Sequence, residues 1–156
     1  MVNPCVPKKA METKLSRSLL VGIAILSVAG MIVSSISLQR HYAKSATSYC
    51  EFGEKFNCDI VNRSEYSSVM GIPVSLIGVA GYALLLALST FYRSRPETPT
   101  RLLMAAAAGL AFALYLTYIE AYVLTTWCIL CLTSLALIAS IAVLAGGLKL
   151  RLATSS

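Results

Sequence analysis

The sequence predicts an all-α integral membrane protein, a four-transmembrane-helix bundle with a loop and a short helix as a lid on its outer face. Of its 156 residues, 57% are hydrophobic and only 13% are charged, whereas soluble domains contain about 25% charged residues. The apolar residues form runs long enough to cross a bilayer, which takes about 20 helical residues. Most basic residues flank these runs on one side. This composition excludes a soluble enzyme, a disordered chain and a nucleic-acid-binding module.

The first two helices follow from two uncharged runs. Residues 19–38 contain no charged side chain and predict a helix over residues 18–39. The next uncharged run predicts a helix over residues 70–92, with Pro73 as an early kink or a first-turn proline. A cleaved signal peptide is the alternative for the first run, but the run is longer than such segments and no A-x-A site follows it.

The last two helices share one apolar run, residues 102–148, whose only charged residue is Glu120. A run of this length is too long for one span. It predicts helices over residues 101–122 and 127–148, with a turn near residues 120–126. Small residues spaced by four in the third helix favour close helix packing; they are Ala105, Gly109 and Ala113.

The distribution of basic residues orients the bundle. Nine of the 13 Lys and Arg residues fall in segments that would be cytoplasmic if the N-terminus is inside, as the positive-inside rule requires. We therefore expect cytoplasmic tails at residues 1–17 and 149–156, flanking a membrane domain over residues 18–148. The outer loop, residues 39–69, is expected to carry the lid, with a short helix after Cys58 and Asp59 as its N-cap.

Four of the five cysteines fall on the outer side, where an oxidising compartment permits disulfides. Cys128 and Cys131 form a C-x-x-C at the start of the fourth helix. Residues i and i+3 share a helix face, at a separation that suits a disulfide. The positive end of the helix dipole is expected to favour the reactive thiolate there. A redox-active pair at the edge of the lipid is the favoured interpretation.

Cys50 and Cys58 form the second pair, in the outer loop. Alone, this pair would indicate a structural disulfide. Two pairs on one side of a membrane bundle also permit a relay, because thiol–disulfide exchange moves electron pairs between dithiols. A four-cysteine zinc site is a third interpretation, with His41 either a ligand or a solvated residue. Cys5 lies in the cytoplasmic tail, outside the relay.

Glu120 is the remaining candidate. An acid within an apolar run is a functional suspect, here for supplying protons. The alternative is an interfacial side chain that reaches water.

These motifs together resemble the bacterial vitamin K epoxide reductase family. The resemblance rests on Cys50-Glu-Phe-Gly-Glu-Lys-Phe-Asn-Cys58, on Ser64, on Gly71-Ile-Pro-Val-Ser-Leu-Ile-Gly78 and on Trp127-Cys128-Ile-Leu-Cys131. Their order, spacing and expected topology match over residues 18–148. The resemblance is more specific than a single C-x-x-C.

The resemblance implies a quinone-dependent thiol–disulfide oxidoreductase that supports disulfide-bond formation. Cys50 would exchange with a DsbA-like or other thioredoxin-fold partner, Cys58 would pass electrons to Cys128, and Cys131 would face a quinone, whether ubiquinone, menaquinone or vitamin K. Ser64 would steady the loop and site. The expected quinone contacts are Cys131, Ser64, Val74 and Glu120, and the expected location is a bacterial inner membrane with a periplasmic active site.

Two positions depart from the vertebrate pattern. Val74 stands near the place of a quinone-binding Asn, and Leu135 stands in place of a Tyr, which argues against epoxide reduction. The alternatives are a vitamin K quinone or epoxide reductase of the endoplasmic reticulum membrane, with a lumenal site, and a cysteine-based metal-ion carrier. Asn62-Arg63-Ser64 is also a glycosylation sequon, and a glycan so close to Cys58 would obstruct the relay.

Overall fold

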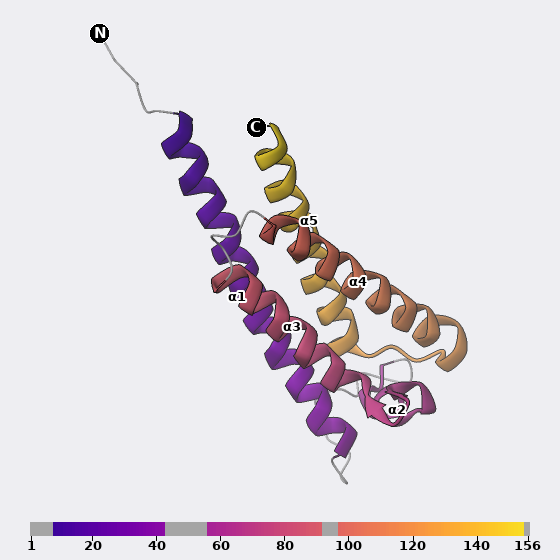
Figure 1. Ribbon diagram of the computed structural model, residues 1–156. Coiled ribbons are helices and arrows are strands. Elements are labelled where there is room, and N and C mark those ends of the chain that lie inside the picture. The colour runs from indigo at the N-terminus through magenta and orange to yellow at the C-terminus, as the bar shows by residue number, and fades with distance from the viewer. Residues whose placement is uncertain (1–7, 43–55, 92–96, 155–156) are drawn as a thin grey trace.

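A computed structural model describes residues 8–42, 56–91 and 97–154 (Figure 1). Cys5 and Cys50 lie outside these residues. In chain order the elements are α1 (Lys8–Tyr42), α2 (Cys58–Arg63), the 3-10 turn η2 (Glu65–Ser67), β1 (Ser68–Val69), β2 (Ile72–Pro73), α3 (Val74–Thr90), α4 (Thr98–Ile119), the π-helical turn η3 (Glu120–Leu124) and α5 (Ile129–Thr154).

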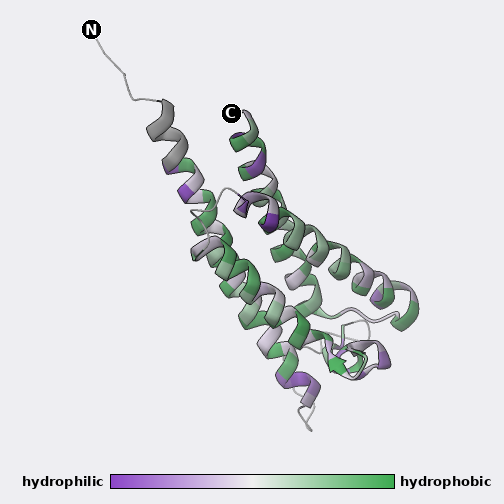
Figure 2. Ribbon diagram, in the orientation of Figure 1, coloured by the Kyte–Doolittle hydropathy of each residue, from purple (hydrophilic) through white to green (hydrophobic). Residues whose placement is uncertain are grey.

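The four long helices form the predicted membrane bundle. Helix α1 packs against α3 and α5, and α4 packs against α5. The helices run alternately up and down, so the C-terminal end of α5 lies near the N-terminal end of α1, while α2 and the α4–α5 turn lie at the opposite end (Figure 1). Figure 2 shows hydrophobic residues along the middle of each helix and hydrophilic ones concentrated toward the ends.

Three helical segments are long and apolar enough to span a membrane, and α3 is a shorter apolar helix of 17 residues. The bundle core contains Ile23, Tyr82, Leu102 and Ile141. Large apolar side chains also cover the outside of the helices; Val143, for example, is 74% exposed. A helix surface that is apolar on all sides suits a lipid environment. The chain is therefore a helical membrane protein.

The helix ends differ from the sequence prediction. Helix α1 starts at Lys8, ten residues before the predicted start at residue 18, and α5 ends at Thr154, six residues beyond residue 148. Hydropathy marks the part of a helix that lies in lipid, but the backbone hydrogen bonds of a helix can continue into the polar flanks.

The second membrane helix starts later than predicted, at Val74 rather than residue 70. The preceding residues form a small hairpin in which Ser68 pairs with Pro73 and Val69 with Ile72. Its two turn residues, Met70 and Gly71, both have positive φ angles, of 53° and 82°. Two such residues define the tight turn that suits a two-residue hairpin.

The short helix predicted after Cys58 is present, but it starts at Cys58 itself and Asp59 does not cap it. The side chain of Asn57 accepts hydrogen bonds from the backbone N–H groups of Asp59 and Ile60, at 3.0 and 3.1 Å. Asn is as good an N-cap as Asp, and a cap at Asn57 makes Cys58 the first residue of the helix.

The small residues of α4 pack as predicted. A Cβ atom at Gly109 would lie only 3.2 Å from Cδ1 of Ile138 on α5. Ala105 and Ala113 pack against the bundle core.

Candidate functional site

Three cysteines meet at the end of the bundle that holds α2. Cys58 and Cys128 are buried and form one cluster with Val61, and Cys131 packs against it. Pairing of the preceding backbone produces this contact. Phe56 and Trp127 form a parallel bridge, and the N–H of Asn57 donates to the carbonyl of Trp127 at 3.2 Å. The segments that lead into Cys58 and Cys128 therefore run side by side.

Asn62 ties α2 to α1 and was not predicted as a site residue. Its Nδ2 donates to the carbonyl of Cys58 at 2.9 Å, while Ser37 Oγ donates to its Oδ1 at 2.7 Å. Its own carbonyl lies 2.6 Å from Nδ1 of His41. His41 is thus part of this network rather than a solvated side chain. Because Asn62 is buried, the sequon is closed to glycosylation in this fold.

Cys128 and Cys131 lie on either side of the start of α5, where the carbonyl of Cys128 accepts the N–H of Leu132 at 3.0 Å. They are not joined in a disulfide. The pKa of the Cys128 thiol lies above its ordinary value, because a hydrogen bond with Cys131 favours the thiol and burial disfavours the thiolate. The expected effect of the helix dipole at this position is thus outweighed.

Glu120 is buried, with 2% of its surface exposed. The interpretation of an interfacial side chain that reaches water is therefore wrong. Its Oε2 accepts the backbone N–H of Cys128 at 3.1 Å. The predicted turn after Glu120 is not a simple loop, since residues Glu120–Leu124 form a π-helical turn.

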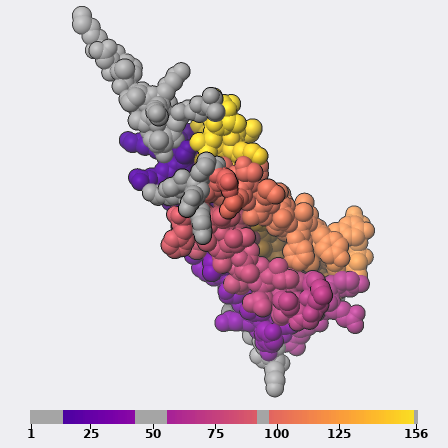
Figure 3. Space-filling model, in the orientation of Figure 1, coloured from indigo at the N-terminus to yellow at the C-terminus, as the bar shows by residue number. Residues whose placement is uncertain are grey.

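An apolar cavity of about 410 Å³ lies between the helices, with Cys131 among its lining residues. Figure 3 shows the surface hollowed between α3 and α4. The four predicted quinone contacts all line this one cavity, although they come from separate parts of the chain. These are Ser64, Val74, Glu120 and Cys131.

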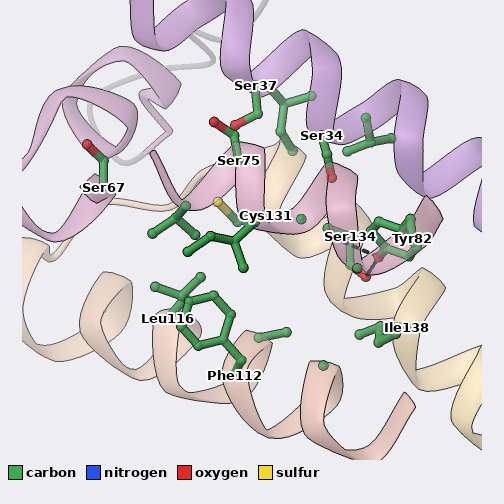
Figure 4. Close-up of a pocket in the computed structure, with 18 of the residues that line it drawn as sticks. Ser34, Ser37, Ser67, Ser75, Tyr82, Phe112, Leu116, Cys131, Ser134 and Ile138 are labelled. Atoms are coloured by element: carbon green, nitrogen blue, oxygen red, sulfur yellow. Dashed lines mark hydrogen bonds between the residues drawn. The ribbon is translucent and has the colours of Figure 1, made fainter. Parts of the chain in front are cut away.

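Figure 4 shows the Cys131 side chain on the cavity wall, with Phe112 and Leu116 across from it. One turn deeper, the hydroxyl of Tyr82 donates to the carbonyl of Ser134 at 2.9 Å and also lies 2.9 Å from its Oγ. Sequence reasoning missed Tyr82 and Ser134. Ser134 could have been predicted from its spacing. It follows Cys131 by three positions and therefore shares its helix face.

The site has no cluster of three or more His, Cys, Asp or Glu side chains arranged to hold a metal ion, within the residues that the structure describes.

A helical membrane bundle that gathers three cysteines at one end, with Cys131 on the wall of an apolar cavity, is typical of a membrane thiol oxidoreductase. The model of the vitamin K epoxide reductase family matches residues 21–145, which is most of the chain, from early α1 to late α5. The chain belongs to this family. It is therefore a redox enzyme of a membrane, in a family whose chemistry involves quinones.

Proposed function

We propose that this protein reoxidises a thioredoxin-fold partner, such as a DsbA-like protein, and passes the electrons to a membrane quinone. The contact between Cys58 and Cys128, with Cys131 at the wall of the cavity, carries this proposal. It gives electrons a short path from a loop that can meet a soluble protein to a site that can hold a lipid-soluble molecule.

The electron path proceeds by thiol–disulfide exchange. The partner dithiol reduces the Cys50–Cys58 disulfide through a mixed disulfide with Cys50. The freed Cys58 thiolate attacks Cys128 in the Cys128–Cys131 disulfide, which releases Cys131 as a thiol. Cys50 then attacks Cys58, restores the first disulfide and releases Cys128. The net result is one oxidised partner and one reduced Cys128–Cys131 pair.

The cavity fits the flat, largely apolar ring of a quinone. Its volume of about 410 Å³ falls in the range of small-molecule sites. A bound quinone supplies the acceptor for two electrons and two protons from the Cys128–Cys131 dithiol. Phe112, Leu116 and Ile138 supply apolar walls that exclude water.

The cavity is also accessible from the lipid. Four of its lining residues on the two flanking helices are exposed, Ile77, Gly81 and Leu84 on α3 and Ala108 on α4. An opening between α3 and α4 lets a membrane-dissolved molecule reach Cys131 without crossing water. We infer a ubiquinone or menaquinone in a bacterial inner membrane, with the cysteines on the periplasmic side.

The test is reconstitution of the purified protein into vesicles that contain ubiquinone or menaquinone. After addition of a reduced DsbA-like protein, quinol should appear in proportion to the partner disulfide formed. Cys128→Ser and Cys131→Ser should each abolish quinol formation, whereas Cys5→Ala should leave it intact. A folded protein that forms no quinol, or that carries stoichiometric zinc, would contradict the proposal.

A further inference from the structure

Of the two carboxyl oxygens of Glu120, one accepts a hydrogen bond and the other does not. Oε2 accepts the N–H of Cys128 and so joins α4 to the start of α5. Oε1 is buried and has no hydrogen-bond partner among the described residues. A buried carboxylate oxygen without a donor is costly. A proton or a ligand at Oε1 would remove that cost.

The backbone holds Glu120 firmly in this position. Its carbonyl accepts the N–H of Thr126 at 3.2 Å and also the N–H of Thr125, which has a left-handed conformation with φ of 49°. The chain therefore reverses around Glu120 between α4 and α5. The side chain cannot turn out to water without losing its hydrogen bond to the N–H of Cys128.

The neighbours of Glu120 identify the proton that it can take. Glu120 and Cys131 both line the cavity, and the Cys131 thiol interacts with the Glu120 carboxyl. The other titratable groups around them are the thiols of Cys58 and Cys128 and the phenols of Tyr66 and Tyr82. No Lys, Arg or His is among the described residues that line the cavity.

We propose that Glu120 is the proton acceptor for Cys131 during oxidation of the Cys128–Cys131 dithiol. This inference rests on the proposed function, in which that pair is oxidised by a quinone. Two S–H bonds break, one S–S bond forms, and two electrons and two protons end on the quinol. The Glu120 carboxyl takes the Cys131 proton and releases it to the quinone oxygen, and the Cys128 proton then leaves by the same carboxyl.

A purely structural role for Glu120 is the competing explanation, and Glu120→Gln separates the two. The amide keeps one carbonyl oxygen, which can accept the N–H of Cys128. It cannot take up a proton. A structural role should therefore survive this substitution, and a proton-accepting role should not.

The experiment follows Cys131 without any quinone. The reduced full-length protein is treated with iodoacetamide from about pH 6 to about pH 9, on either side of the ordinary thiol pKa, and alkylation of Cys131 is followed by mass spectrometry. In the wild type, proton transfer within the Glu120–Cys131 pair should give a rate nearly independent of pH below neutrality. In Glu120→Gln the thiolate forms only by losing its proton to water, so the rate should rise about tenfold per pH unit.

At about pH 6 the wild type should react at least about tenfold faster than Glu120→Gln, a threshold set below the general-base effects of about 10²–10⁴-fold. At high pH the two alkylation rates should become equal, or Glu120→Gln should react faster, because the variant lacks the negative charge near Cys131. The matched control is Glu97→Gln, the same change on an exposed acid at the other end of α4, paired with Arg101. Its profile should follow that of the wild type.

Coincident profiles of wild type and Glu120→Gln would overturn the inference, and so would a variant that reacts faster at every pH. If Glu120→Gln does not fold, infrared difference spectra of the wild type decide instead. Glu120 is the only Asp or Glu that is buried among the residues whose burial is described, so a protonated-carboxyl band should change between the dithiol and disulfide forms. No such change would contradict the inference. Neither measurement uses a quinone or a partner protein, so both can be interpreted even if the proposed function fails its own test.

Discussion

The burial of Cys58 against Cys128 restricts the disulfides that this end of the chain can form. Cys58 is 1% exposed and Cys128 is fully buried, so neither sulfur can meet a soluble protein in this conformation. Cys131, by contrast, is partly exposed and faces the cavity. The sulfur that can reach a cavity ligand and the sulfur that can reach Cys58 are thus different members of one C-x-x-C.

This division of roles predicts the behaviour of Cys131→Ser. Without Cys131 the Cys128 sulfur loses its partner in α5, and the nearest remaining thiol is Cys58. A Cys58–Cys128 disulfide should therefore accumulate and should be recovered as a linked peptide by mass spectrometry without reductant. Cys5→Ser, the control, should yield no such peptide. Recovery of Cys58 unlinked, or linked only to Cys50, would show that the inward transfer proposed here is wrong.

The sequence identifies the residues of the site better than it identifies their surroundings. The four cysteines stand out because they form two pairs on one side of the expected bundle, and Glu120 stands out because it is the only charged residue in its apolar run. The role of Asn62 could not be predicted, because its partner Ser37 lies 25 positions away on another helix. The burial of Glu120 likewise depends on the turn that points its carboxyl at Cys128, and hydropathy does not reveal that turn.

At the scale of elements, the existence of each helix is predictable and its ends are not. The four predicted membrane helices correspond to α1, α3, α4 and α5. The π-helical turn at Glu120–Leu124 has no sequence signal, since it lies in the same apolar run as α4. Extra residues in such turns often occur at functional sites. Here the turn brings the Glu120 carboxyl within hydrogen-bond distance of the N–H of Cys128, the first residue of the C-x-x-C.

Close packing of α1 on α3 predicts a large effect of Gly30→Ala. A Cβ atom at Gly30 would overlap the ring of Tyr82, which is 5% exposed and hydrogen-bonded to Ser134. Since overpacking costs about 1–3 kcal/mol, the variant should unfold at a lower temperature in detergent. Displacement of Tyr82 should also weaken quinone binding, because Tyr82 lines the cavity.

Gly22→Ala on the same helix is the matched control. A Cβ atom there would lie 3.6 Å from the Leu144 side chain, an ordinary contact. This variant should match or slightly exceed the wild-type stability, since Ala in a helix interior is better than Gly by about 0.5–1 kcal/mol. Equal melting temperatures for the two variants would mean that α1 and α3 are not packed as described.

At the scale of the whole molecule, the even number of helices separates two ends with different roles. The end with the chain termini carries most of the basic residues, and the other carries the cysteine cluster and α2 (Figure 1). The cavity extends from the cysteine cluster into the apolar middle of the bundle. This arrangement would let one protein connect a soluble thiol partner with a lipid-soluble acceptor.

The orientation of the bundle follows from its charges and can be tested at two matched positions. Tyr42 and Leu150 are each 69% exposed but lie at opposite ends of the bundle, at the end of α1 and near the end of α5. Basic residues are retained on the cytoplasmic side, so we expect Leu150 inside and Tyr42 outside. In a chain whose native cysteines are replaced by Ser, a membrane-impermeant maleimide should label Tyr42→Cys in intact cells. It should label Leu150→Cys only after permeabilisation. The reverse pattern would leave the bundle intact but place the cysteine cluster in the reducing compartment, where the two disulfides of the proposed relay would not persist.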